Sequence, residues 1–597
     1  MTTNPLPSDG QAAQAPIDER FRDPALPIEE RVEILLHQMT LEEKAGLFFH
    51  TMILMGENGH LVDATPAYGL PSTREMVVDR NLSHFNVLGT AKTARSMAEW
   101  QNRLQELARS TRLGIPVTLS SDPRHSFTDN PGIGFQAGAF SEWPEPLGLA
   151  AIGDEVLVER FADIARQEYT AVGLRLALHP QVDLTTESRW ARQVGTFGED
   201  AELSGRLGAA YVRGFQGENL GRDSVATMTK HFPGGGPQKD GEDPHFAYGR
   251  EQVYPGDNRE YHLIPFEKVI EAGGSQMMPY YGMPVGTDWE EVGFGFNRSV
   301  ITALLRERFG FDGIVCTDWG LLSDADIMGD HFPARAWGVE DLSVPDRMAK
   351  ALEAGVDQFG GETISPTLVE LVRSGKVSEE RVDVSARRLL REKFRLGLFD
   401  DPFVDPAIAE SCVGSPEFRA EGLDAQRASI TLLTNSGVLP LTRGIRIYSE
   451  GVDPAILTDY GVAAPTPDDA DVAILRLQAP YERRGTTFEN RFHAGSLDFS
   501  DEVVDHVSSI GTQLTTIVDV FLDRPAILTP FVDRASAITG NFGASAVALL
   551  DVLFGVAPRG HLPFDLPSSM GAAAARRPDV SFDSADPLFP FGHGLTY

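Results

Sequence analysis

The sequence is poor in cysteine and in long apolar runs. Only Cys316 and Cys412 occur in 597 residues, which is too few for a disulfide framework and fits a reducing compartment. No apolar stretch reaches the roughly 18 residues of a membrane-spanning helix. Residues 1–19 have neither a basic start nor an apolar core, so they do not look like a secretory signal. We therefore expect a soluble, cytoplasmic protein.

Basic residues are also scarce. Lys and Arg total 52 against 86 Asp and Glu, which gives a formal net charge of -34. A charge of this sign repels nucleic acids and anionic membranes, so we expect neither as a partner. A hydrophobic content of 42% and the chain length are typical of two or three packed domains. The composition leaves the oligomeric state open.

Helical patterns alternate with short apolar runs over the first 350 or so residues. We predict a helix over about 27–39, followed by a capping box of Thr40 with Glu43. Later strands are predicted at 115–119, 174–178, 225–229, 276–278 and 314–317. Alternating strands and helices favour a parallel sheet, and a (β/α)8-type barrel is its commonest closed form. A doubly wound sheet is the alternative.

A second α/β unit follows a break in this pattern. Residues 397–416 contain three prolines and the adjacent Asp400 and Asp401, which indicates a linker. We predict a flexible tail over 1–25, a barrel over 26–396, the linker over 397–416 and an α/β sandwich over 417–597. The apolar closing segment 589–597 is expected to dock on a domain.

Polar residues follow the predicted barrel strands. They are Asp122, Arg189, Lys230, His231, Tyr280 and Asp318. Because barrel active sites lie at the carboxyl ends of the strands, we predict that one face collects these side chains. Asp318 ends an apolar run and precedes Trp319, so it is the candidate nucleophile. Capping of the next helix is its alternative role.

The ligand predicted for this face is a neutral sugar. The glycines after Lys230-His231 are not followed by a Gly-Lys-Ser/Thr ending, and nearby acidic residues would repel a phosphate. Lys230 and His231 suit sugar hydroxyls as hydrogen-bonding partners, and Asp122 can accept from two of them. The rings of Tyr280 and Trp319 suit the apolar face of a pyranose, and a salt bridge is the alternative role of Arg189.

Several longer motifs point to one family. Residues 187–192 are similar to its Asp-Pro-Arg-Trp-Gly-Arg motif, although Glu187 and Ala191 depart from it, and 230–234 match its Lys-His-Phe-Pro-Gly motif. Residues 310–319 resemble its nucleophile strand, and 435–441, 554–563 and 591–597 resemble hallmarks of its second domain. The chain thus resembles glycoside hydrolase family 3 over nearly its whole length.

The resemblance implies a barrel followed by an α/β sandwich, with the sugar held at their interface. It also implies retention of anomeric configuration through a covalent glycosyl enzyme on Asp318, and sugar binding by the other strand-end residues. A retaining site needs two carboxyl groups roughly 5 to 5.5 Å apart. We expect no cofactor, and no metal because Lys230 and Arg189 already balance the carboxylates.

The acid/base is less defined, because its position varies within this family. Our choice is Glu482, just beyond a predicted strand at 472–477. The alternatives are Glu489 and a dyad of Asp243 and His245, which resembles the Asp-Ser-His motif of the N-acetylglucosaminidase branch.

We therefore predict an exo-acting β-glucosidase that acts on a small β-glycoside. The alternatives are a β-N-acetylhexosaminidase or glycoside phosphorylase that uses the dyad, a β-xylosidase, and a non-catalytic sugar-binding protein.

Overall fold

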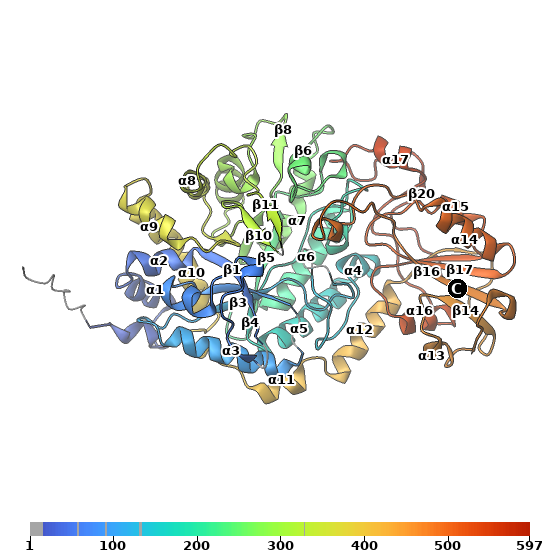
Figure 1. Ribbon diagram of the computed structural model, residues 1–597, viewed down its shortest axis with the longest axis horizontal. Coiled ribbons are helices and arrows are strands. Elements are labelled where there is room, and N and C mark those ends of the chain that lie inside the picture. Colours follow the sequence, from blue (N-terminus) through green and yellow to red (C-terminus); the bar gives the residue numbers. More distant parts are fainter. Residues whose placement is uncertain (1–15, 57–58, 90–91, 130–133, 328) are drawn as a thin grey trace, which may run out of the picture.

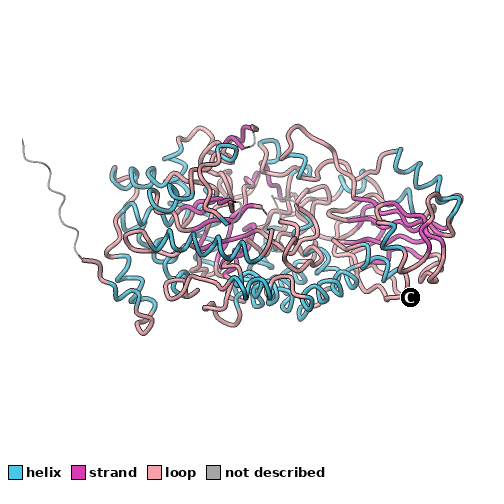
Figure 2. The backbone as a smooth tube through the Cα atoms, turned by 60° about the horizontal axis from the view of Figure 1, so that its bottom comes forward, coloured by secondary structure: helices cyan, strands magenta, loops and turns pink. Residues whose placement is uncertain are grey.

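The computed structural model describes residues 16–56, 59–89, 92–129, 134–327 and 329–597. Its strands form two separate groups, one in each half of an elongated molecule (Figure 2). The barrel half comes first in the chain. The long helix α12 (Pro416–Ser429) leads from it to the second half (Figure 1).

Eight parallel strands form the first sheet, in the order β12-β1-β2-β3-β4-β5-β7-β9. They are β1 (Phe49–Leu54), β2 (His84–Leu88), β3 (Thr118–Ser121), β4 (Leu174–Ala177), β5 (Ala226–Phe232), β7 (Gln276–Pro279), β9 (Ile314–Val315) and β12 (Phe359–Gly360). A parallel bridge between Cys316 and Gln358 joins the two outer strands. The sheet is therefore a closed barrel, as predicted, and not a doubly wound sheet.

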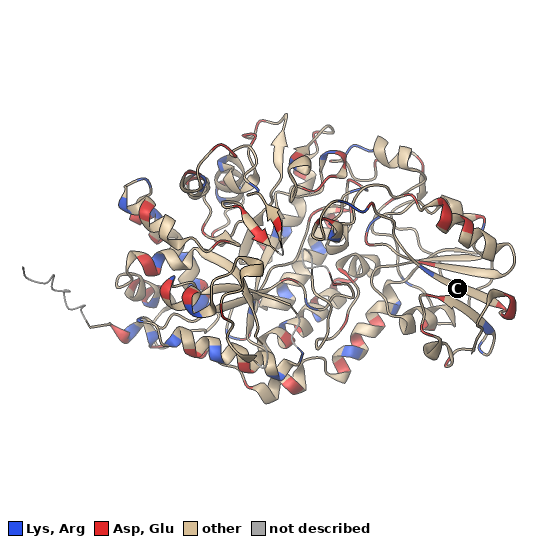
Figure 3. Ribbon diagram, viewed as in Figure 1, with Lys and Arg blue, Asp and Glu red and all other residues tan. Residues whose placement is uncertain are grey.

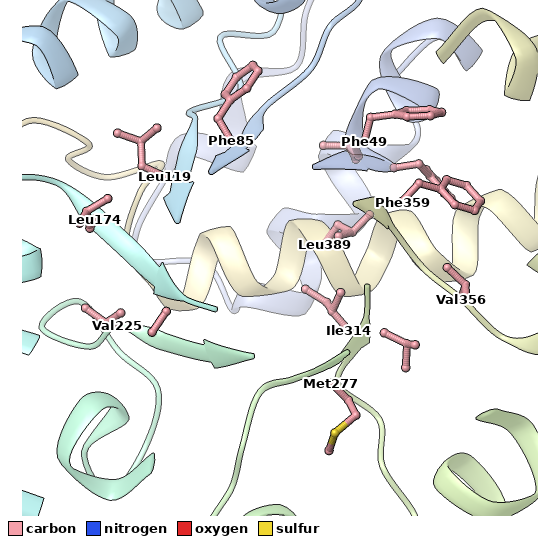
Figure 4. Close-up of a cluster of buried hydrophobic side chains, with 14 of the residues drawn as sticks. Phe49, Phe85, Leu119, Leu174, Val225, Met277, Ile314, Val356, Phe359 and Leu389 are labelled. Carbon is pink, nitrogen blue, oxygen red and sulfur yellow. The ribbon is translucent and has the colours of Figure 1, made fainter. Parts of the chain in front are cut away.

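Helices surround this barrel. They are α1 (Ile28–Leu36), α2 (Leu41–Leu47), α3 (Ala94–Arg109), α5 (Glu155–Ala171), α6 (Ala201–Gln216), α7 (Arg259–Glu271), η9 (Ser299–Arg308), α8 (Val344–Ala354), α9 (Ser365–Arg373) and α10 (Glu379–Arg395). The predicted capping box of Thr40 and Glu43 is present at α2. Apolar side chains from successive strands meet Leu389 of α10 in one buried cluster (Figure 4).

The outer helices carry acidic and basic side chains interspersed (Figure 3). Arg387 and Arg391 of α10, for example, pair with Glu33 and Glu29 of α1. Every helix among the described residues is too short or too polar to cross a lipid bilayer.

The second half is a six-stranded sheet with the order β13-β18-β17-β16-β14-β15. The strands are β13 (Thr431–Asn435), β14 (Arg446–Glu450), β15 (Val462–Ala463), β16 (Val472–Gln478), β17 (Thr515–Phe521) and β18 (Ala537–Asn541), and only β13 is antiparallel to its neighbour. Its helices include α14 (Asp501–Gly511) and α16 (Ala546–Leu553). The unit is the predicted α/β sandwich.

Both ends of the described chain are packed. Leu595 forms a bridge with Leu432 of β13, so the closing segment docks on the sandwich as expected. Residues 1–15 of the predicted flexible tail lie outside the described residues. Beyond them Glu19–Arg22 forms a 3-10 turn in which Phe21 is fully buried. This part of the tail is therefore fixed to the barrel by apolar burial.

Candidate active site

Asp318 lies two residues beyond the bridge that closes the barrel, at the carboxyl end of β9. Only 7% of the residue is exposed. Its Oδ1 accepts a hydrogen bond from the amide of Trp319 at 2.8 Å, whereas its buried Oδ2 has no hydrogen-bond partner in the described part of the chain. One oxygen is thus held in place by the main chain, while the other forms no hydrogen bond.

Lys230 and His231 end strand β5 beside this carboxylate. Lys230 Nζ donates to Asp122 Oδ1 at 2.9 Å, which links the ends of β5 and β3. His231 Nδ1 lies 2.7 Å from Asp183 Oδ2, and its Nε2 lies 3.8 Å from Asp318 Oδ2. Burial lowers the pKa of His231 well below its usual value. The neutral ring therefore donates from Nδ1 to Asp183 and leaves Nε2 as an acceptor for a hydroxyl.

The arginine near Asp318 is Arg192, and not the predicted Arg189. Arg189 forms a two-pronged ion pair with Glu187, whose side chain is 2% exposed. Arg192 is 2% exposed. Burial alone would lower the pKa of Arg192, but the charges of nearby groups that include Asp243 and Asp318 hold it above its usual value. The motif contains two arginines, and the role predicted for Arg189 stays a prediction.

Tyr280 lies deeper in the protein than the other predicted site residues. It is fully buried, its ring centre lies 4.7 Å from that of His231, and its hydroxyl donates to Asp243 Oδ2 at 3.1 Å. Its side chain therefore packs against His231 and Asp243 inside the protein, and no face of its ring is exposed.

Its neighbour Tyr281 lies closer to the reaction centre. The Tyr281 hydroxyl donates to the carbonyl of Trp319 at 2.6 Å. Burial, and then the charge of Asp318, raise its pKa well above 10. Trp319 itself is half-buried and meets His50 edge to face at 5.2 Å, so part of its ring remains open to a ligand.

Glu482 belongs to the loop between β16 and α14, and its side chain is 55% exposed. Its amide donates to the carbonyl of Ala494 at 2.9 Å, and Arg484 approaches its Oε2 to 3.6 Å. Arg484 also pairs with Glu242 of the barrel at 2.9 Å, so this sandwich loop reaches the barrel face. The carboxyl is therefore solvated, and the loop that carries it contacts the barrel through Arg484.

The two alternative acids have other contacts. Glu489 accepts a hydrogen bond from the Tyr248 hydroxyl at 2.5 Å. His245 Nδ1 lies 2.6 Å from Asp243 Oδ1, and its ring is wedged between Tyr281 and Phe492 at 4.6 and 4.7 Å. Burial lowers the pKa of His245. His245 is thus held by Asp243 on one side and enclosed by two aromatic rings.

The position of Arg192 leads to a paired prediction. Arg192→Lys is expected to lower kcat/KM for a β-glycoside roughly 30- to 100-fold, because lysine lacks the planar fork that holds several oxygens at once. Arg189→Lys keeps its charge beside Glu187 and is expected to cost less than about 5-fold. Steady-state kinetics and melting temperatures of both variants provide the measurement. A larger loss for Arg189→Lys would contradict this assignment.

The described residues hold no group of three or more His, Cys, Asp or Glu side chains placed to bind a metal ion.

Comparison with known proteins places this geometry in a family. Beta-glucosidase C of Emericella nidulans is 52% identical over 98% of this chain and 97% of its own length. A periplasmic beta-glucosidase/beta-xylosidase of Dickeya chrysanthemi is 42% identical, over 97% and 91% respectively. A b-glucosidase structure from Erythrobacter marinus superimposes with a TM-score of 0.79 at 22% identity, over 97% of this chain and 84% of that one.

Two family descriptions also match the chain itself. Residues 70–392 match the glycosyl hydrolase family 3 N terminal domain, and residues 457–597 match the C-terminal domain of the same family. Together with relatives that align over nearly the whole chain, these matches leave one conclusion. The chain belongs to glycosyl hydrolase family 3.

Proposed function

We propose that this chain is a retaining, exo-acting β-glucosidase that removes terminal β-D-glucosyl residues from the non-reducing end of a small glycoside. The observation that carries the proposal is the unpartnered Oδ2 of Asp318 beside Arg192, within a ring of hydroxyl-binding side chains. The names of the relatives support glucose as the sugar.

The reaction has two steps. Asp318 Oδ2 attacks the anomeric carbon while the bond to the leaving oxygen breaks, and Glu482 gives that oxygen its proton. Water then attacks the anomeric carbon, Glu482 takes the water proton, and the ester to Asp318 breaks. Lys230, Asp122 and His231 orient the sugar hydroxyls, and Arg192 stabilises the carboxylate charge. Each step inverts the configuration at the anomeric carbon, so the released sugar has the same anomeric configuration as the substrate.

A panel of nitrophenyl glycosides tests the proposal. We expect β-glucoside hydrolysis to exceed that of β-N-acetylglucosaminide by about 100-fold or more, with no stimulation by phosphate, because Asp243 and two aromatic rings hold His245 in place. Proton NMR of the product is expected to show the β-anomer first. Initial release of the α-anomer would contradict the mechanism.

The β-xyloside arm of the panel answers a more specific question. The Dickeya relative is named as both a glucosidase and a xylosidase, so we include β-xylosidase activity as a second candidate. Comparable kcat/KM on both nitrophenyl glycosides would establish it, whereas a preference for glucose of about 10-fold or more would exclude it as a main activity.

Cellular location stays a separate proposal. We infer a cytoplasmic location from the composition alone, and the Dickeya relative, which is named periplasmic, does not support it. Activity in fractionated source cells tests this point.

A further inference from the structure

Arg524 is a fully buried side chain of the sandwich that follows strand β17. Burial lowers the pKa of Arg524 to about 10, so the group is charged at neutral pH. Its guanidinium donates to five main-chain carbonyls, those of Arg189 (3.0 Å), Pro480 (2.6 Å), Ala494 (3.1 Å), Gly495 (3.0 Å) and Ser496 (2.8 Å). A buried cation that binds only carbonyls fixes main chain with unusual strength.

Four of these carbonyls belong to the loop that carries Glu482. Pro480 lies just before Glu482, and the Ala494 carbonyl also accepts the Glu482 amide at 2.9 Å. Gly495 lies directly under the Glu482 side chain, since a Cβ built there would be 2.2 Å from Oε2. Arg524 therefore holds both sides of this loop, while the Glu482 carboxyl itself is 55% exposed.

The fifth carbonyl belongs to the barrel. Arg189 is three residues before Arg192, whose charge acts on Asp318. One guanidinium thus joins the main chain beneath Glu482 to the barrel segment that places Arg192 beside Asp318. We propose that Arg524 is a positioning residue that sets the placement of the proton donor relative to the nucleophile across the two domains. This inference rests on Glu482 being the acid/base of the proposed function.

The variant Arg524→Lys tests the proposal, because lysine keeps the charge but cannot bridge five carbonyls. We expect kcat/KM for methyl β-glucoside, a poor leaving group, to fall roughly 30-fold or more. Dinitrophenyl β-glucoside needs little protonation, and its kcat/KM is expected to change by less than about 3-fold. Azide is expected to accelerate turnover of the dinitrophenyl substrate, because a misplaced Glu482 is also a poor base.

Two further variants separate positioning from stability. Arg576→Lys is the matched control, since Arg576 is a buried arginine of the sandwich that pairs across the interface with Glu199. It is expected to lower Tm without changing the ratio of the two substrates. Gly495→Ala keeps the Arg524 side chain but places a Cβ against the Glu482 carboxyl, at a φ of +80° that alanine adopts poorly and on a residue whose carbonyl accepts from Arg524. It is expected to reproduce the selective loss on methyl glucoside.

The possible outcomes separate a positioning role of Arg524 from a purely stabilising one, and both from an error in the assignment of Glu482. Equal losses on both substrates in Arg524→Lys, with Tm lowered as in Arg576→Lys, would mean that Arg524 only stabilises the interface and would overturn this inference. Glu482→Ala is assayed in parallel. If Glu482→Ala loses no more activity on methyl β-glucoside than on dinitrophenyl β-glucoside, the assignment of Glu482 as the acid/base is wrong. If Glu482→Ala shows the selectivity and Arg524→Lys does not, only the inference about Arg524 fails.

Discussion

Asp318→Ala is expected to lower kcat/KM for β-glucosides by roughly 10⁴-fold or more, which corresponds to about 5.5 kcal/mol of lost transition-state stabilisation. The loss is large because no other described carboxylate near Arg192 is without a partner. Asp243 accepts bonds from Trp190, Tyr280 and His245, and Asp183 holds His231. Neither can take over the attack on the anomeric carbon.

Chemical rescue makes this prediction specific. In Asp318→Ala, azide is expected to attack the anomeric carbon from the side where the Asp318 carboxylate stood. An activated β-glucoside should therefore give α-glucosyl azide. A mechanism-based fluorosugar is expected to label Asp318 in the parent protein. Asp326→Ala is the control, because Asp326 is an exposed carboxylate of the hairpin β10 (Ala325–Ile327) to β11 (Asp330–Phe332). Labelling of a different side chain would disprove the proposed nucleophile.

Glu482→Ala is expected to have the second-largest effect, and the effect depends on the leaving group. We expect a loss of about 10² to 10⁴ in kcat/KM for methyl β-glucoside, because general acid catalysis contributes that much. Dinitrophenyl β-glucoside should lose less than about 10-fold in the same constant. Azide should yield β-glucosyl azide in this variant, opposite in configuration to the product of Asp318→Ala.

The competing acids supply the controls. Glu489→Ala removes a carboxylate that is bound to Tyr248, and it is expected to treat both substrates alike. His245→Gln tests the dyad in the same way. Selective loss on methyl β-glucoside in either variant, together with its absence in Glu482→Ala, would transfer the role of proton donor to that residue.

The sequence predicted strands whose residues are mainly apolar, such as β4 and β7, although Arg175 and Gln276 lie in them. It missed β1 and β2, because His50 and Thr51 in β1, and His84 and Asn86 in β2, break the apolar pattern although all four are at most 4% exposed. His50 pairs with His84 across the two strands, so these two polar side chains lie side by side within the buried sheet. A prediction that equates polarity with exposure cannot find such strands.

The residues of the candidate site also differ in how far the sequence predicts their positions. Asp318, Lys230 and His231 directly follow the strands predicted at 314–317 and 225–229, so their place at one face follows from the topology, although their roles stay predictions. Arg189 against Arg192, and Tyr280 against Tyr281, are choices between identical residue types a few positions apart. Glu187 pairs with Arg189 from two residues away, so an acidic residue next to one of the two arginines was a local signal that pointed to the other. Tyr280 is bound by Asp243, 37 residues away along the chain, and one sequence contains no signal for that contact.

The barrel closes between β9 and β12, each of which has only two residues. A single bridge from Cys316 to Gln358 joins them at this seam. The proposed nucleophile lies two residues beyond that seam. Ring closure and the placement of Asp318 thus depend on the same short segment, so a change that opens the seam is expected to displace the carboxylate as well.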